Sequence, residues 1–134
     1  MKSKHLVQFY ETDLMGIVHH SNYLRFFEEA RVHWAHNHGF INYQKPESAS
    51  HFAVLETRVL HKKPAKFGDQ LEVDIQAKNE GIKIIFQYRL LRGNEILALG
   101  ETIHVSLDKN LKPMRLDKKL VELLEKNQWK EIWL

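Results

Sequence analysis

The residues with the clearest chemical potential lie in a short segment just before a predicted helix. The segment contains a carboxylate, Asp13, a glycine, Gly16, and a pair of histidines, His19 and His20. A carboxylate in this place lies beside the free backbone N–H groups of a helix N-terminus, where the helix dipole is positive. Such a carboxylate can act as a general base or as a nucleophile while the N–H groups stabilise a developing oxyanion.

Two elements must position this segment. Residues 4–9 are partly apolar, which indicates a short first strand. Ser21 or Asn22 is suited to cap a helix that enters at Tyr23. Between them, Gly16 lets the backbone turn sharply or approach a ligand closely. The sequence therefore predicts a strand, an acidic turn and a helix N-terminus in succession.

The predicted helix covers residues 23–38, because apolar residues recur there at helical spacing. One stripe contains Tyr23, Phe26, Phe27, Ala30 and Trp34. Gly39 follows as a C-terminal stop, and Glu28 and Arg31 are spaced for an ion pair on the helix surface. The apolar surface is wide, so we expect the helix to be wrapped on more than one side.

Beyond the helix the apolar period changes to two, which is typical of strands. Strands are predicted over residues 52–61, 71–78, 82–90 and 95–107, with hairpin turns at 79–81 and 92–94. On the last strand, one face is predicted to carry Leu97, Leu99, Ile103 and Val105. Gly100 is expected at a bulge or a close approach. One long helix followed by an antiparallel meander predicts an α+β architecture in which the sheet curls around the helix.

A dense pattern within residues 13–31 resembles the signature of hotdog-fold acyl-CoA thioesterases, in particular the hydroxybenzoyl-CoA thioesterases and the Tol–Pal-linked YbgC type. The pattern reads Asp13-x-x-Gly16-x-Val18-x-His20-x-x-Tyr23-x-x-Phe26-x-Glu28-x-Ala30-Arg31. The downstream elements fit as well, so the resemblance covers most of the chain. It implies the hotdog fold, a curved antiparallel sheet wrapped around a long central helix, as a single domain over residues 1–134.

The resemblance also implies an activity: hydrolysis of an acyl-CoA thioester to CoA and a free carboxylic acid. Asp13 would be the base or the nucleophile, and the family leaves open which of the two applies. The backbone N–H of His20 would polarise the thioester carbonyl. The His20 imidazole can orient Asp13 or contact the substrate, although a loop histidine is more often a local hydrogen-bonding group. Gly16 would shape the catalytic turn.

Other residues have weaker assignments. Tyr23 and His19 would border the substrate. A carboxylate on the helix, Glu28 or Glu29, is the second choice of catalyst, because other hotdog thioesterases place a catalytic Glu there. Three positions depart from the YbgC-type pattern, so the substrate range of that group is not carried over. The departures are Glu11 where Asp is frequent, Leu14-Met15 in place of small residues, and His19 where an aromatic residue is frequent.

Partners follow from the resemblance and from charge. Hotdog dimers form a continuous sheet, often associate into tetramers, and build each active site between two subunits, so we expect a homodimer or homotetramer. Lys62, Lys63 and Lys66 can meet the phosphates of CoA as point charges. The net charge of +3 comes from scattered residues with no basic helix, so no nucleic-acid partner is expected.

The composition limits the alternatives. The 134 residues are 43% hydrophobic and 28% charged, as in an ordinary globular domain, and contain no cysteine. Disulfides, a Cys nucleophile and thiolate metal sites are therefore excluded. His33, His36 and His38 are too loosely spaced to predict a metal site, and no cofactor is expected because CoA is part of the substrate. No apolar run is long enough to span a membrane and residues 1–5 lack a signal segment, so we expect a cytoplasmic protein.

Two other functions remain open. A hotdog enoyl-thioester hydratase or dehydratase could use Asp13 and His20, although the His-x-x-x-Pro-Gly stretch of the dehydratase kind is absent. A non-catalytic acyl-CoA-binding module is the other alternative, since a fold does not fix a function. The presence of Asp13 in the loop favours the enzyme.

Overall fold

The computed structural model describes residues 2–45, 47 and 51–134, and residues 1, 46 and 48–50 lie outside the described part. In chain order the elements are β1 (Lys2–Leu6), the 3₁₀ turn η1 (Phe9–Glu11), α1 (Ser21–Asn37), β2 (His51–His61), β3 (Gln70–Glu80), β4 (Lys83–Arg92), β5 (Glu95–Leu107), β6 (Pro113–Met114) and α2 (Lys118–Lys126). No helix in these ranges is long and apolar enough to cross a membrane.

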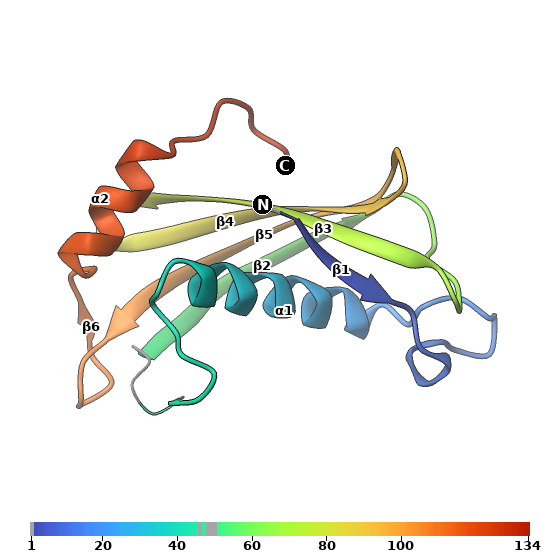
Figure 1. Cartoon of the computed structure of the whole chain (residues 1–134), viewed down its shortest axis with the longest axis horizontal. Coiled ribbons are helices and arrows are strands. Elements are labelled where there is room, and N and C mark those ends of the chain that lie inside the picture. Colours follow the sequence, from blue (N-terminus) through green and yellow to red (C-terminus); the bar gives the residue numbers. More distant parts are fainter. Residues whose placement is uncertain (1, 46, 48–50) are drawn as a thin grey trace.

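The strands form one antiparallel sheet in the order β1-β3-β4-β5-β2, and the short β6 pairs with the end of β5. The long helix α1 lies along one face of this curved sheet (Figure 1). The predicted α+β architecture, a sheet wrapped around one central helix, is therefore confirmed. In the described part of the chain β2 pairs with β5 alone, so its other edge is open.

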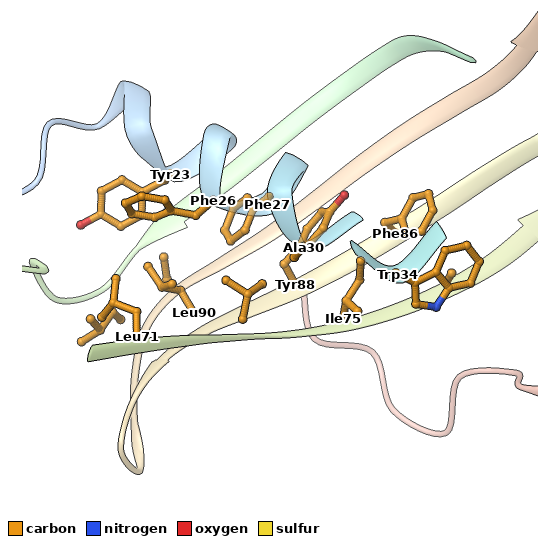
Figure 2. Packing of buried hydrophobic residues seen from close by; sticks show 14 of the residues in the cluster. Tyr23, Phe26, Phe27, Ala30, Trp34, Leu71, Ile75, Phe86, Tyr88 and Leu90 are labelled. Atoms are coloured by element: carbon orange, nitrogen blue, oxygen red, sulfur yellow. The ribbon is translucent and has the colours of Figure 1, made fainter. Parts of the chain in front are cut away.

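The core lies between α1 and the sheet (Figure 2). The five predicted stripe residues of α1 are all buried: Tyr23, Phe26, Phe27, Ala30 and Trp34. The sheet contributes alternate residues of β3 and β4: Leu71, Val73, Ile75, Ala77, Ile84, Phe86, Tyr88 and Leu90. Ile82, which was predicted to belong to this face, instead lies exposed in the hairpin turn before β4.

Gly100 on β5 lies directly beneath the ring of Phe27. A Cβ atom on Gly100 would overlap that ring. The ring is wholly buried and stacks on Tyr88 with a centroid distance of 4.6 Å, so it has little room to move. The prediction of a close approach at Gly100 is confirmed, and the absence of a side chain there sets how closely α1 packs on the sheet.

The start of α1 differs from the prediction. The helix begins at Ser21, and its N-cap is His20, whose side chain forms no capping hydrogen bond. The Ser21 N–H donates instead to Nδ1 of His19, at 3.2 Å. Asn22 is buried inside the first turn and donates to the carbonyl of Glu11, at 2.9 Å. Asn22 therefore ties the helix to the preceding loop, and the predicted cap at Ser21 or Asn22 was wrong.

The first strand is also shorter than predicted. It ends at Leu6, and Phe9 lies exposed in η1. The Glu11 carboxylate causes this change, because it accepts a hydrogen bond from the Gln8 N–H at 2.7 Å and so closes the 3₁₀ turn. Glu11 is itself buried and lies 2.8 Å from His5 Nε2 on β1.

The inner face of β5 is more polar than the apolar alternation suggested. Leu99, Ile103 and Val105 share a face, as predicted, but their cross-strand pairs place them on the side of the sheet away from α1. A bulge at Leu97 shifts the register, so that Leu97 has no direct partner on β4. The residues of β5 that face α1 are Ala98, Gly100, Thr102 and His104.

A chain of hydrogen bonds runs along this polar face. Arg31 Nη1 donates to the Tyr88 hydroxyl at 3.1 Å, that hydroxyl lies 2.6 Å from Thr102 Oγ1, and Thr102 Oγ1 lies 2.8 Å from His104 Nε2. The predicted ion pair between Arg31 and Glu28 is not found among the described residues, because the guanidinium turns toward the sheet. This hydrogen-bond chain links Arg31 on α1 to the buried His104.

The buried His104 makes stability depend on pH. Burial, reinforced by the nearby charge of Arg31, lowers the pKa of His104 to about 4 from 6.5. The unfolded chain takes up a proton as the pH falls below 6.5 while the folded chain stays neutral, so stability is present above this value and is lost toward pH 4. We expect a loss of about 2 kcal/mol in the free energy of unfolding over this range.

His104→Val isolates this effect, because it removes this one imidazole and leaves the other histidines in place. Urea unfolding at pH 7 and pH 4.5 should show a smaller loss of stability for the variant than for the wild type. Equal losses in the two proteins would mean that His104 does not titrate as described.

The last residues cover the face of the sheet opposite α1 (Figure 1). The side chain of the buried Gln87 accepts from the Trp133 N–H at 2.8 Å and donates to the Leu134 carbonyl at 3.2 Å. The Lys78 ammonium lies 4.4 Å from the Trp129 ring centroid, and the Arg89 guanidinium lies 4.1 Å from that of Trp133. The C-terminal segment thus shields part of the outer face, whereas the β2 edge is left open.

Candidate functional site

Asp13 and Gly16 form a tight turn in the loop between η1 and α1. The Asp13 carbonyl accepts from the Gly16 N–H at 3.0 Å, and Asp13 Oδ1 accepts from the Met15 N–H at 2.8 Å. Gly16 has a φ of +78°, a conformation that side chains disfavour, so the turn requires glycine there. One carboxylate oxygen of Asp13 therefore holds the turn, while Oδ2 has no hydrogen-bond partner among the described residues.

The loop is fixed at both ends by backbone hydrogen bonds. The Asp13 N–H donates to the Ile17 carbonyl at 2.9 Å, and the Val18 N–H donates to the Ala65 carbonyl at 2.8 Å. The Glu11 carbonyl accepts from the His19 N–H at 2.9 Å, just before the helix. These bonds hold the half-buried Asp13 at a defined distance from the N-terminus of α1, as a catalytic carboxylate requires.

The backbone N–H of His20 is an unused donor at the start of α1. Its neighbours on either side are occupied, since the His19 N–H binds Glu11 and the Ser21 N–H binds the His19 ring. For His20 the structure gives no acceptor among the described residues. A free N–H at the positive end of a 17-residue helix is suited to bind an oxyanion.

Asp13 and His20 line the same cavity, which has a volume of about 350 Å³. Five of the predicted site residues meet there: Asp13, His20, Tyr23, Lys62 and Lys63. Gly16 and His19 lie on the other side of the loop, where they line a separate open pocket of about 790 Å³ together with Asp13. Lys66 lines neither space, although its backbone pairs with Ile17.

Tyr23 and the two lysines have more defined roles than the sequence indicated. Tyr23 is buried, and its hydroxyl accepts a hydrogen bond from the Ala65 N–H at 3.3 Å. Both lysine N–H groups donate to the Leu97 carbonyl at the β5 bulge, at 2.9 and 3.0 Å. The Lys63 ammonium is paired with Glu95 at 2.9 Å, whereas Lys62 forms no ion pair with any described residue.

His61 is a site residue that sequence reasoning missed. It ends β2 and packs edge-on against Tyr23, with a centroid distance of 4.6 Å, on the wall of the same cavity. Partial burial, followed by repulsion from His20, lowers the pKa of His61, so a neutral imidazole is favoured. The only sequence signal was its position next to Lys62 and Lys63, at the end of a predicted strand.

The helix carboxylates lie apart from this cavity. Neither Glu28 nor Glu29 contributes to its wall. Glu29 lies 3.4 Å from His5 on β1, which places it on the side of α1 away from β2. Within residues 2–45, 47 and 51–134 no group of three His, Asp or Glu side chains is arranged to hold a metal ion.

Comparison with known proteins places the chain in a family. The model of the thioesterase-like superfamily matches residues 7–124. A putative esterase from Aquifex aeolicus is 34% identical over 89% of this chain and 93% of its own length. The acyl-CoA thioester hydrolase YbgC from Escherichia coli is 29% identical over 86% of this chain and 88% of its own length.

Solved structures share the fold over nearly the whole chain. The crystal structure of a hypothetical protein from Aquifex aeolicus superimposes with a TM-score of 0.84 and 33% identity, covering 92% of this chain and 98% of the other. The family model, the relatives and the loop geometry agree. The chain therefore belongs to the thioesterase-like superfamily, as a hotdog-fold thioester hydrolase of the YbgC-like type.

Proposed function

We propose that the protein hydrolyses acyl-CoA thioesters, with Asp13 as the catalytic carboxylate and the His20 N–H as the oxyanion donor. The observation that carries this proposal is that Asp13 and His20 line one cavity, each with a polar group that has no hydrogen-bond partner among the described residues. Asp13 Oδ2 is left free by the turn, and the His20 N–H is left free by the helix. The name of the E. coli relative, an acyl-CoA thioester hydrolase, supports a CoA thioester as the substrate.

In the base route, Asp13 removes a proton from water as the water oxygen attacks the thioester carbonyl carbon. The carbonyl oxygen becomes an oxyanion that accepts a hydrogen bond from the His20 N–H. The C–S bond then breaks, the CoA thiolate takes the proton held by Asp13, and the carboxylic acid is released. In the nucleophile route, Asp13 itself displaces CoA, and water hydrolyses the resulting acyl anhydride.

A panel of acyl-CoA thioesters tests the proposal, with release of the free thiol as the readout and enoyl-CoA hydration as a parallel assay. We expect thiol release from at least one acyl class and no hydration. Hydration without thiol release would favour the hydratase. An inert panel with tight acyl-CoA binding would favour a binding module.

We further propose that two copies pair through β2 to form a homodimer, the unit from which a tetramer can be built. β2 is 11 residues long and pairs only with β5 in the described part of the chain. Its exposed side chains include Phe52, Val54, Leu55 and Leu60. An open apolar edge strand is a template for pairing with a second copy, and two-fold symmetry makes that pairing antiparallel.

Charge on the β2 edge should separate the subunits. Val54→Lys combined with Leu55→Lys should shift the mass in light scattering toward the monomer, because four added positive charges would be brought together in the dimer interface. Ile82→Lys, at an exposed hairpin tip, is the control and should leave the mass unchanged. A wild-type monomer at concentrations where the enzyme is active would contradict the proposed dimer.

Lys62 is the best placed of the three predicted lysines to contact CoA phosphates. It lines the Asp13 cavity, which Lys66 does not, and its ammonium is not paired with a described residue, whereas that of Lys63 is paired with Glu95. Lys62→Ala should raise KM about fivefold with little change in kcat, since a phosphate contact stabilises ground and transition states alike. Lys66→Ala is the control. The effect should disappear with a pantetheine thioester that lacks the nucleotide, and equal effects on both substrates would contradict a phosphate contact.

A further inference from the structure

A second cavity lies between the C-terminal half of α1 and the sheet, with a volume of about 230 Å³. Its walls are mainly apolar and include Trp34, Phe40, Phe52 and Phe86. A cavity of about 150 Å³ in another protein is known to hold benzene, so this one has room for a substituted ring or a compact branched chain. It is too small for a whole CoA thioester, since complete ligand sites usually exceed about 300 Å³.

Two polar residues, Arg31 and His104, interrupt the apolar wall. His104 is only 2% exposed. Its Nε2 atom binds Thr102, but the structure gives Nδ1 no hydrogen-bond partner among the described residues. Polar atoms in a protein interior are normally paired, so the unpaired Nδ1 of a residue in the cavity wall can bind a polar atom of a ligand in that cavity.

The hydrogen-bond chain determines which proton His104 carries. Arg31 can only donate, so the Tyr88 oxygen accepts from it. Tyr88 is wholly buried, and among the described residues Thr102 Oγ1 is the acceptor within reach of its hydroxyl hydrogen, so that hydrogen goes to Thr102. Burial raises the pKa of Tyr88, which keeps that hydrogen in place. The Thr102 hydroxyl then donates to Nε2 of His104, which leaves the imidazole proton on Nδ1. This hydrogen-bond chain therefore leaves the Nδ1–H of His104 as a hydrogen-bond donor.

The proposed dimer brings this cavity to the catalytic loop of the other subunit. Phe52, on the cavity wall, lies near the start of β2, whereas His61, on the wall of the Asp13 cavity, ends β2. Antiparallel pairing of β2 with its copy sets the start of one strand beside the end of the other. Within one subunit the two cavities lie toward opposite ends of α1. Tyr23 lines one and Trp34 lines the other, and the helical rise of 1.5 Å per residue separates these two residues by about 16 Å.

We propose that the α1–sheet cavity receives the acyl group of a thioester bound at Asp13 of the partner subunit, and that His104 selects acyl groups bearing an acceptor oxygen. The favoured substrates are aryl or compact branched acyl thioesters with an ether, ketone or phenol oxygen far from the thioester carbon. This inference rests on the proposed function and on the β2 dimer. His104 thereby determines specificity, and Thr102 positions it.

A matched pair of substrates tests the role of His104. 4-Methoxybenzoyl-CoA and 4-ethylbenzoyl-CoA have nearly the same shape, but only the first has an acceptor oxygen. We expect His104→Val to lower the methoxy-to-ethyl ratio of kcat/KM about tenfold, because one hydrogen bond to a buried donor is lost. Ile84→Val changes the apolar wall alone and should leave the ratio unchanged. An unchanged ratio in His104→Val would overturn the proposal.

Mixed dimers test whether the cavity acts across the interface. In a dimer of Asp13→Asn with His104→Val, one site would combine an intact Asp13 with an intact cavity from the other chain. Such dimers should recover the wild-type substrate ratio at about half the wild-type rate. If the cavity serves its own Asp13, the ratio should stay that of His104→Val, which would overturn the assignment across subunits.

Two measurements keep this inference separate from the proposed function. Binding of the two thioesters to Asp13→Asn, measured by calorimetry, needs no turnover and should show the same preference even if no thioester is hydrolysed. Nitrogen-15 NMR of the unmodified protein reports the His104 tautomer directly, so it needs no variant to fold. A proton on Nε2, or equal binding of the two thioesters, would contradict the inference.

Discussion

Asp13→Asn should lower kcat for thioester hydrolysis about a thousandfold, or about 4 kcal/mol in the barrier, while the protein remains folded. The geometry explains why the fold survives. Asn can still accept the Met15 N–H through Oδ1, so the turn that ends at Gly16 persists. The change is confined to the second oxygen, which has no partner among the described residues and is the atom available for chemistry.

Glu28→Gln and Glu29→Gln are the matched controls for Asp13→Asn. Both remove a carboxylate from α1, close in sequence to the site, but neither residue lines the Asp13 cavity. Each should keep turnover within about threefold of the wild type, as expected for groups that do not touch the reacting atoms. Single-turnover hydrolysis by the three variants decides the assignment. An active Asp13→Asn protein together with an inactive helix variant would show that the catalyst is on α1.

Gly100→Ala should have the largest effect on stability, with a loss of about 3 kcal/mol in the free energy of unfolding. The added methyl would overlap the ring of Phe27. That ring is wholly buried and stacks on Tyr88, so in a close-packed interior it has little room to move aside. Gly93→Ala is the control, because nothing lies within 4 Å of its Cβ position and only its positive φ opposes the change. We expect about 1 kcal/mol there.

A second substitution tests whether the overlap is the cause. Phe27→Leu shortens the ring that Gly100→Ala would meet, so the double variant should lose less stability than the sum of the two single losses. Urea unfolding of the four proteins gives this coupling as a double-mutant cycle. Additive losses would show that Gly100 matters for another reason, such as the twist of β5.

The sequence alone determined the parts of this protein that depend on short-range order. The stripe of α1 and the alternation along β3 were readable because each reflects one periodic face against one apolar core. The turn formed by Asp13 and Gly16 was readable for a similar reason, although the helix cap beside it was not. Asp13, Gly16 and the start of the helix lie within one turn-forming segment, so their geometry depends on few other parts of the chain. The resemblance carried by residues 13–31 then supplied the fold and the activity.

The tertiary structure decided the features that depend on strand register and on which of two possible partners a side chain binds. The bulge at Leu97 turns Thr102 and His104 toward α1. No local sequence pattern predicts this shift of one residue in the register between β4 and β5. Arg31 has Glu28 within helical reach, yet it binds Tyr88, which is 57 positions away, because the buried hydroxyl needs a partner more than the exposed carboxylate does. His61 joins the site only because β2 ends against Tyr23. Each of these depends on which residues the sheet brings opposite one another, and that is set by the packing of the whole chain.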